Sequence, residues 1–141
     1  MEIATGDLIL FKNTSFWKTE PYTKYGIAIK TPKFPNFYSD GLFVLTCKEG
    51  KPCLMKIRED EPDIEVRKLE ESIDRFLLSD IYSIVNNSRK VYNFSSSALT
   101  VLVYIWTGIL PTETDWINAD ITTLTDPCKL LWLKPFKTRH M

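Results

Sequence analysis

The sequence predicts an α+β fold in which a mainly antiparallel β-sheet packs against a buried helix. Two observations support this fold class. Short apolar runs separated by turn-forming residues fill positions 1–60, as expected for a series of antiparallel strands. The longest apolar stretch, residues 98–110, lies far along the chain and is expected to form the core of a helix buried by its neighbours.

Four strands are expected in the first part of the chain. The first run, "DLILFK", is bounded by Gly6 and Asn13, which is typical of a buried strand. The last two runs flank Gly50, and glycine tolerates the positive φ that the tight turn of a hairpin requires. The four runs are residues 7–12, 25–31, 41–47 and 53–57.

The hydrophobic period changes after the acidic, proline-broken loop "REDEPD" (58–63). We expect "IEVRKLEESIDRFLL" (64–78) to form an amphipathic helix, because its apolar residues recur at helical spacing. "DIYSIV" (80–85) then returns to the pattern of a strand. The apolar positions on one face of the predicted helix are Leu69, Ile73, Phe76 and Leu77.

A second helix is expected from about Ser96 to Thr107, with Trp106 in its core. Gly108 follows the last helical residue and Pro111 blocks any continuation, so the helix should end there. A final strand is predicted in "KLLWL" (129–133).

Length and composition indicate one domain spanning residues 1–141, with 44% hydrophobic and 26% charged residues. The N-terminus does not resemble a signal peptide, and residues 98–110 fall short of the roughly 18 to 20 residues that a membrane span needs. We therefore expect an intracellular, cytoplasmic protein without a membrane span.

The residue types argue against several classes of site. Eighteen basic residues balance eighteen acidic ones, so we expect no nucleic-acid partner, whose binding would need a stripe of lysines on one face. Cys47, Cys53 and Cys128 are an odd number without metal-like spacing, and reduced thiols are expected. Because the single histidine is His140, next to the C-terminus, we expect neither a metal site nor a cofactor.

Five segments, taken in order, resemble the permuted NlpC/P60 family of papain-like thiol hydrolases. They are "TGDLILF", "TKYGIAI", "GLFVLTC", "VRKLEESIDRFLLSDIYSIV" and "SSALTVLVYIWTGIL", and they cover most of residues 5–110. The resemblance implies a papain-like core. In that family a cysteine nucleophile begins the buried helix, a Thr-His-Val-Gly motif supplies the histidine, and the third strand supplies a polar partner. A helix N-terminus suits the nucleophile because it lowers a thiol's pKa and offers N–H groups to an oxyanion.

The resemblance assigns these three roles to residues that depart from the family's pattern. Aligning Gly26 with the motif glycine puts Lys24 at the histidine position. Counting back from Gly108 puts Ser96 at the cysteine position, and a shift of one residue would choose a neighbouring serine. The polar partner becomes Thr46. The scaffold is similar to the family's, whereas the catalytic side chains have been replaced.

The resemblance therefore predicts a catalytically inactive relative, a pseudoenzyme that acts as a binding or structural module. Ser95, Ser96 and Ser97 then serve as helix caps, because a hydroxyl can accept a hydrogen bond from an unpaired N–H. Members of the family occur in large DNA viruses, which makes virion association a further expectation from the resemblance.

The alternative is an active amide or ester hydrolase in which Ser96 is the nucleophile and Lys24 its base. Serine–lysine pairs perform acyl transfer when the lysine is buried enough to lose its proton. This hypothesis requires the Lys24 amine within hydrogen-bonding reach of the serine hydroxyl.

Aromatic residues in two loops are the candidate binding residues, and the expected partner is a protein. Trp and Tyr are frequent interface anchors, and aromatic side chains held by prolines lose little entropy on docking. The structural interpretation is that these side chains cover the edge of a small sheet. The oligomeric state is left open. The candidate binding residues are Trp17, Tyr22, Phe34, Phe37 and Tyr38.

Overall fold

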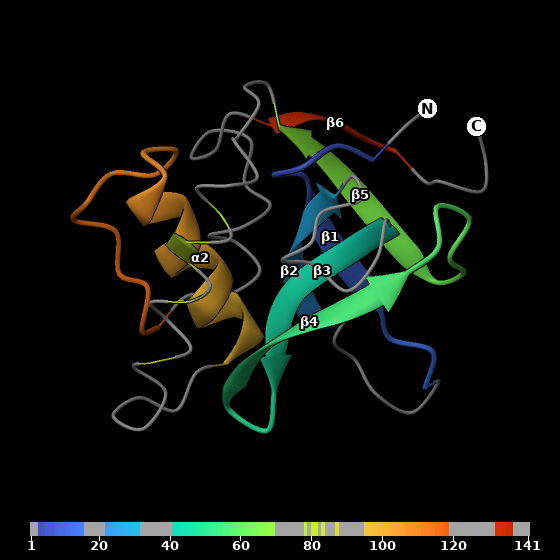
Figure 1. Ribbon diagram of the computed structural model, residues 1–141, viewed down its shortest axis with the longest axis horizontal. Coiled ribbons are helices and arrows are strands. Elements are labelled where there is room, and N and C mark those ends of the chain that lie inside the picture. The colour runs from blue at the N-terminus through green and yellow to red at the C-terminus, as the bar shows by residue number, and fades with distance from the viewer. Residues whose placement is uncertain are drawn as a thin grey trace.

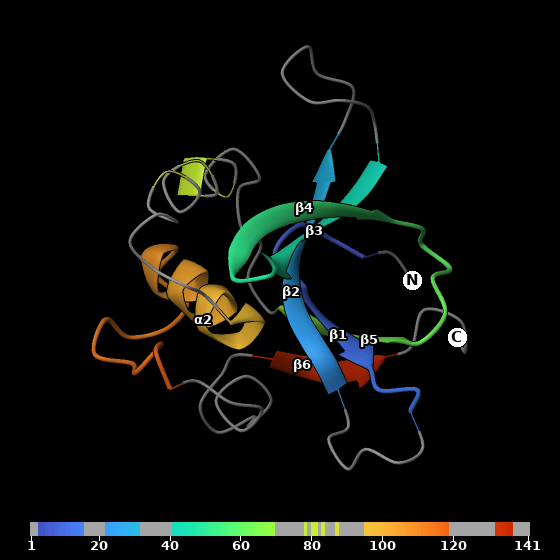
Figure 2. The ribbon, with the colours of Figure 1, turned by 90° about the horizontal axis from the view of Figure 1, so that it is seen from below.

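The computed structural model shows a curved antiparallel β-sheet with helix α2 (Ser96–Trp106) against its convex face (Figures 1 and 2). This arrangement confirms the predicted α+β class. The structure describes residues 3–15, 22–31, 41–69, 95–118 and, for the backbone alone, 132–136, together with the single positions 78, 80, 81, 83 and 87.

Within the described residues, six strands form the sheet in the order β4-β3-β2-β1-β5-β6, and each neighbouring pair is antiparallel. The four strands predicted within residues 1–60 are confirmed. The last strand overlaps the predicted range but lies later, beyond the predicted end at residue 133. The strands are β1 (Leu8–Lys12), β2 (Tyr22–Thr31), β3 (Gly41–Lys48), β4 (Lys51–Ile57), β5 (Ile64–Leu69) and β6 (Trp132–Phe136).

The hairpin between β3 and β4 has the predicted glycine in its turn. Lys48 pairs with Lys51, so the loop consists of Glu49 and Gly50 alone. Both have positive φ, 55° and 78°, as a type I′ turn requires. This turn fixes the register of β4 against β3.

The helix predicted over 64–78 is wrong in its first part. Ile64–Leu69 forms β5, which lies between β1 and β6. The physical reason is visible in the burial: Ile64 and Val66 are buried, while Glu65 and Arg67 between them are only partly buried. This period of two suits a strand, and pairing with β1 outweighs the helical spacing that begins at Leu69. Residues 70–77 lie outside the described part.

The strand predicted over 80–85 is also wrong where the structure describes it. Asp80, Ile81 and Ser83 are helical, as is Leu78. Leu78 and Ile81 are buried, whereas Asp80 and Ser83 are exposed. Buried residues three apart, with one exposed residue between them and another after them, are typical of an amphipathic helix, so the pattern fits the helical period better than the strand period.

Helix α2 begins at the predicted Ser96 and ends at Trp106, one residue before the predicted Thr107, which is its C-cap. The Oγ of Ser95 accepts a hydrogen bond from the backbone N–H of Ala98 (3.1 Å), which caps the N-terminus. Gly108 has a φ of 83° and ends the helix. The prediction that Trp106 belongs to the core is wrong, because this residue lies in the last helical turn with 44% of its surface exposed.

The sheet has a hydrophobic core on each face, since alternate residues of each strand point to opposite sides. The convex core lies between the sheet and α2, and its members include Leu8, Leu10, Ile27, Ile29, Leu99 and Tyr104. The concave core fills the curl of the sheet, and its members include Ile9, Ala28, Val44, Ile57, Ile64 and Val66.

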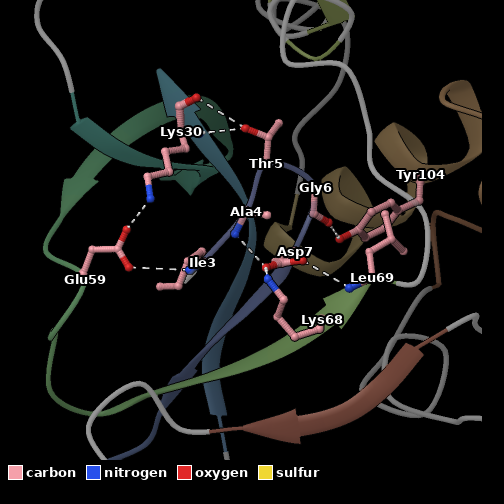
Figure 3. Close-up of polar contacts among 10 residues, drawn as sticks. All are labelled: Ile3, Ala4, Thr5, Gly6, Asp7, Lys30, Glu59, Lys68, Leu69 and Tyr104. Carbon is pink, nitrogen blue, oxygen red and sulfur yellow. Dashed lines mark hydrogen bonds and ion pairs between the residues drawn. The ribbon is translucent and has the colours of Figure 1, made fainter. Parts of the chain in front are cut away.

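A buried carboxylate joins the N-terminal turn to β5 (Figure 3). Asp7 is 2% exposed. Its Oδ2 accepts hydrogen bonds from the N–H of Ala4 (2.8 Å) and from Nζ of Lys68 (2.5 Å), and its Oδ1 accepts one from the N–H of Leu69 (3.1 Å). Three donors therefore satisfy a charge that would be costly to bury alone.

The same turn also holds α2. The hydroxyl of Tyr104, which is fully buried, donates to the carbonyl of Gly6 at 2.7 Å (Figure 3). Burial, and secondarily the negative charge of Asp7, raise the pKa of Tyr104 well above its ordinary value. The phenol thus remains a proton donor, and the helix is anchored to the segment that leads into β1.

We predict that Asp7→Asn lowers the free energy of unfolding by about 2–4 kcal/mol. The side-chain amide of asparagine is neutral, so the ion pair with Lys68 is lost. Its NH2 group can also face the N–H of Ala4 or of Leu69, which are donors as well. Urea unfolding measures the effect. Asp60→Asn, at an exposed position, is the control and should change stability by less than about 0.5 kcal/mol. Equal stability of the two variants would contradict the role assigned to Asp7.

Candidate functional site

The three serines at the start of α2 make different contacts. Ser95 is the N-cap, and its Oγ lies 3.3 Å from that of Ser97. The Oγ of Ser96 accepts a hydrogen bond from the backbone N–H of Tyr25 in β2, at 3.1 Å. The hydroxyl at the predicted nucleophile position therefore ties the helix to the sheet.

Thr46, predicted as the polar partner, contacts the same residue from β3. Its side chain is buried, and Oγ1 donates to the carbonyl of Tyr25 at 2.6 Å. The backbone of Tyr25 is thus bonded at its N–H by Ser96 and at its C=O by Thr46. We call this arrangement, Ser96–Tyr25–Thr46, the Tyr25 clamp. It links α2, β2 and β3.

Gly26, the anchor of the resemblance, lies where β2 and β3 approach closely. A Cβ at this position would lie 2.2 Å from Cγ1 of Val44 and 2.8 Å from the carbonyl oxygen of Leu45. Since no side chain fits at these distances, the close approach of the two strands explains the glycine.

The structure does not bring Lys24 to Ser96. The Lys24 amine lies 4.8 Å from the centre of the Phe11 ring and 3.7 Å from Sδ of Met55. Phe11 and Met55 pack against the concave core, whereas α2 covers the convex face. The lysine and the serine are therefore on opposite faces of the sheet, and in this arrangement Lys24 cannot act as the base for Ser96.

A polar network that the sequence did not indicate lies on the convex side. The hydroxyl of Tyr22 donates to Oε1 of Glu65 (2.9 Å), whose other oxygen pairs with Nε of Arg67 (3.0 Å). Burial first, and then Glu65, raise the pKa of Tyr22. The ring packs near Tyr25, with 6.3 Å between ring centroids. The missed signal was the strand alternation of residues 64–69, which places Glu65 and Arg67 on one face.

Tyr22 is thus the one predicted binding residue in the described part, and there it is partly buried against the convex core. This position favours packing as its role. The other predicted binding residues lie outside the described residues, and so do Cys128 and His140. They are Trp17, Phe34, Phe37 and Tyr38.

Cys47 and Cys53 are free thiols, as expected. Cys47 pairs with Pro52 and Cys53 with Thr46, so the two side chains point to opposite faces of the β3–β4 hairpin. Burial, and to a smaller extent Cys53, raise the pKa of Cys47 to about 12. This thiol is therefore not an activated nucleophile, for which a lowered pKa is needed.

Neither a metal site nor a membrane-spanning helix is found among the described residues. No group of three or more His, Cys, Asp or Glu side chains in this part lies where it could hold a metal ion. None of the helices described here is long and apolar enough to cross a membrane.

Comparison with models of protein families, with curated proteins and with solved structures finds no match to this chain. The resemblance to permuted NlpC/P60 hydrolases therefore stays a prediction.

We predict that Cys47 reacts with iodoacetamide about a thousandfold more slowly near pH 8 than an ordinary cysteine does. The thiolate is the reactive form, so a pKa raised to about 12 depletes it at that pH, and the rate should keep rising as the pH increases. The measurement uses Cys53→Ser/Cys128→Ser, in which Cys47 is the remaining thiol. Denaturation in guanidinium should restore ordinary reactivity. Fast alkylation of the folded variant would disprove the prediction.

Proposed function

We propose that this chain is a non-catalytic relative of the permuted NlpC/P60 hydrolases that acts as a binding or structural module for a protein partner. Association with a virion is the setting that the resemblance suggests. The observation that carries the proposal is the Tyr25 clamp: two of the three positions that the resemblance assigns to catalysis hold the backbone of one residue.

Each contact of the clamp supports a structural role. A nucleophilic serine needs a base that accepts its proton, whereas Ser96 Oγ accepts a hydrogen bond from an N–H. A residue that orients a catalytic base needs a free acceptor or donor directed at that base, whereas Thr46 donates to a main-chain carbonyl. These are the contacts of residues that fix a helix on a sheet.

The third position supports the same interpretation. The ammonium of Lys24 lies over the Phe11 ring, where a cation is favoured by the negative face of the aromatic system. The amine is thus directed at an aromatic ring and not at a hydroxyl that it could deprotonate. Lys24 also lies on the concave face, so no rotation of the Ser96 side chain brings the Ser96 hydroxyl to the Lys24 amine.

The scaffold that remains is suited to binding. The antiparallel sheet and α2 hold each other through the clamp and through the Tyr104–Gly6 hydrogen bond. A rigid scaffold of this kind presents its loops and edges in fixed positions, which lowers the entropy that a partner must overcome on docking.

We predict that Ser96→Ala lowers the free energy of unfolding by about 1–2 kcal/mol and leaves the rate of ester hydrolysis at the background level of the wild type. The variant deprives the Tyr25 N–H of its acceptor, so the exchange of that amide with solvent should accelerate. Urea unfolding, amide exchange and hydrolysis of p-nitrophenyl acetate are the measurements.

Ser95→Ala is the matched control for this experiment. It removes a neighbouring hydroxyl and should accelerate exchange at Ala98, whose N–H bonds to Ser95, rather than at Tyr25. The proposal fails if the wild type hydrolyses the ester above background and Ser96→Ala abolishes that rate.

A further inference from the structure

The amine of Lys24 reaches across the concave face of the sheet to the sulfur of Met55. Nζ of Lys24 donates a hydrogen bond to Sδ of Met55 at 3.7 Å, and the same amine lies 4.8 Å from the centre of the Phe11 ring. Lys24 belongs to β2 and Met55 to β4, with β3 between them, so the lysine side chain spans two strand spacings. We call Lys24 and Met55 the amine–thioether pair.

Strand register brings these side chains to one place. Phe11 of β1 is directly paired with Lys24, so both side chains lie on the same face of the sheet. Met55 is directly paired with Val44, whose buried side chain belongs to the concave core. Phe11 and Met55 are partly buried and pack against that core. The amine–thioether pair therefore lies at the margin of the concave core.

The Lys24 amine has only weak partners. An ammonium group has three N–H donors, and a thioether sulfur is among the weakest acceptors in proteins. Among the contacts of the described residues, neither an ion pair nor a hydrogen bond to an oxygen involves this amine. Its remaining contact is the face of the Phe11 ring. The amine can therefore bind a stronger acceptor formed at the sulfur of Met55.

Oxidation of the thioether forms such an acceptor. Partly buried methionines react with hydrogen peroxide, and the product is the sulfoxide. A lone pair of Sδ attacks one peroxide oxygen, the O–O bond breaks and an S–O bond forms. The second oxygen leaves as water once a proton has moved to it. The sulfur loses two electrons to the peroxide, and its new oxygen is a strong hydrogen-bond acceptor.

We propose that Met55 is a reversible oxidation site of this protein, at which a peroxide forms the sulfoxide and the Lys24 ammonium binds the new oxygen. In the reduced protein the amine lies over the Phe11 ring, and in the oxidised protein it turns from that ring to the sulfoxide. Methionine sulfoxide reductases reverse the change. The inference goes beyond the proposed function, since it needs neither a protein partner nor a lack of catalysis.

The position of Lys24 sets Met55 apart from an incidental oxidation site. A sulfoxide is polar, so its formation beside apolar packing ordinarily disrupts that packing. Here a charged donor already touches the sulfur, and a hydrogen bond to a charged group is stronger than one between neutral groups. The ammonium therefore offsets part of the disruption. Cys53 lies two residues earlier on the same face, but the amine is directed at Met55.

The first test treats the wild type with hydrogen peroxide and locates the added oxygen by mass spectrometry of its peptides. Oxygen on Met55 is expected, together with loss of the nuclear Overhauser cross-peaks between the ε-methylene protons of Lys24 and the ring of Phe11. A mixture of the two methionine sulfoxide reductases, one for each epimer, should restore these cross-peaks. Met55→Leu is the matched control, because leucine has a similar volume without a sulfur atom, and its Lys24–Phe11 cross-peaks should survive the peroxide.

The second test measures the role of Lys24 by urea unfolding. Lys24→Leu keeps an apolar side chain and removes the donor, so oxidation of Met55 should shift the unfolding midpoint down by at least about twice as much as in the wild type. Each protein is compared with the same protein carrying Met55→Leu, which subtracts the effect of peroxide on the cysteines and on the other methionines.

Three results would overturn the inference. They are an unmodified Met55 after Met1 and Met141 have been oxidised, an equal loss of the Lys24–Phe11 cross-peaks in Met55→Leu, and equal midpoint shifts with and without the Lys24 amine. None of these results depends on ester hydrolysis, so the inference and the proposed lack of catalysis fail independently.

Discussion

The rest of the structure depends on the buried carboxylate of Asp7. Its oxygens accept hydrogen bonds from the N-terminal turn at Ala4 and from β5 at Lys68 and Leu69. The carbonyl of Gly6, one residue before it, receives the buried hydroxyl of Tyr104. A short segment of the chain therefore positions the sheet and α2 together. Because the charge is buried, each of its donors must stay in place, which limits how far β5 can move relative to β1. The hydrogen bond from Tyr104 to Gly6 limits the movement of α2 in the same way.

The start of α2, where the resemblance predicts a nucleophile, lies beside β2 and is bonded to it through Ser96. The hydroxyls of Ser96 and Thr46 are both bonded to the backbone of Tyr25, so the polar groups at this place fix one strand rather than act on a substrate.

Much of the sheet can be predicted from sequence because the signals of β1 to β4 are local: apolar alternation, a glycine in a hairpin turn and a helix ended by Gly108. β5 could not be separated from a helix, since Ile64–Leu69 runs into residues with helical spacing and its pairing with β1 is distant in sequence. The site was predicted only as a set of residue types. Ser96 and Tyr25 are 71 residues apart, and nothing in the sequence shows that a hydroxyl at one bonds the backbone of the other. The face on which Lys24 lies depends on how β2 pairs with β1, and no local pattern in the sequence shows this register.

The central claim is that Lys24 and Ser96 are held on opposite faces of the sheet and do not form a catalytic pair. The most direct measurement is the nuclear Overhauser effect from the ε-methylene protons of Lys24 in the folded protein in solution. Cross-peaks to the ring protons of Phe11 and to the methyl group of Met55 are the predicted result, since the Lys24 amine lies beside both side chains. Cross-peaks to the β-protons of Ser96 would contradict the account, because they would place the amine where a base for that hydroxyl must be.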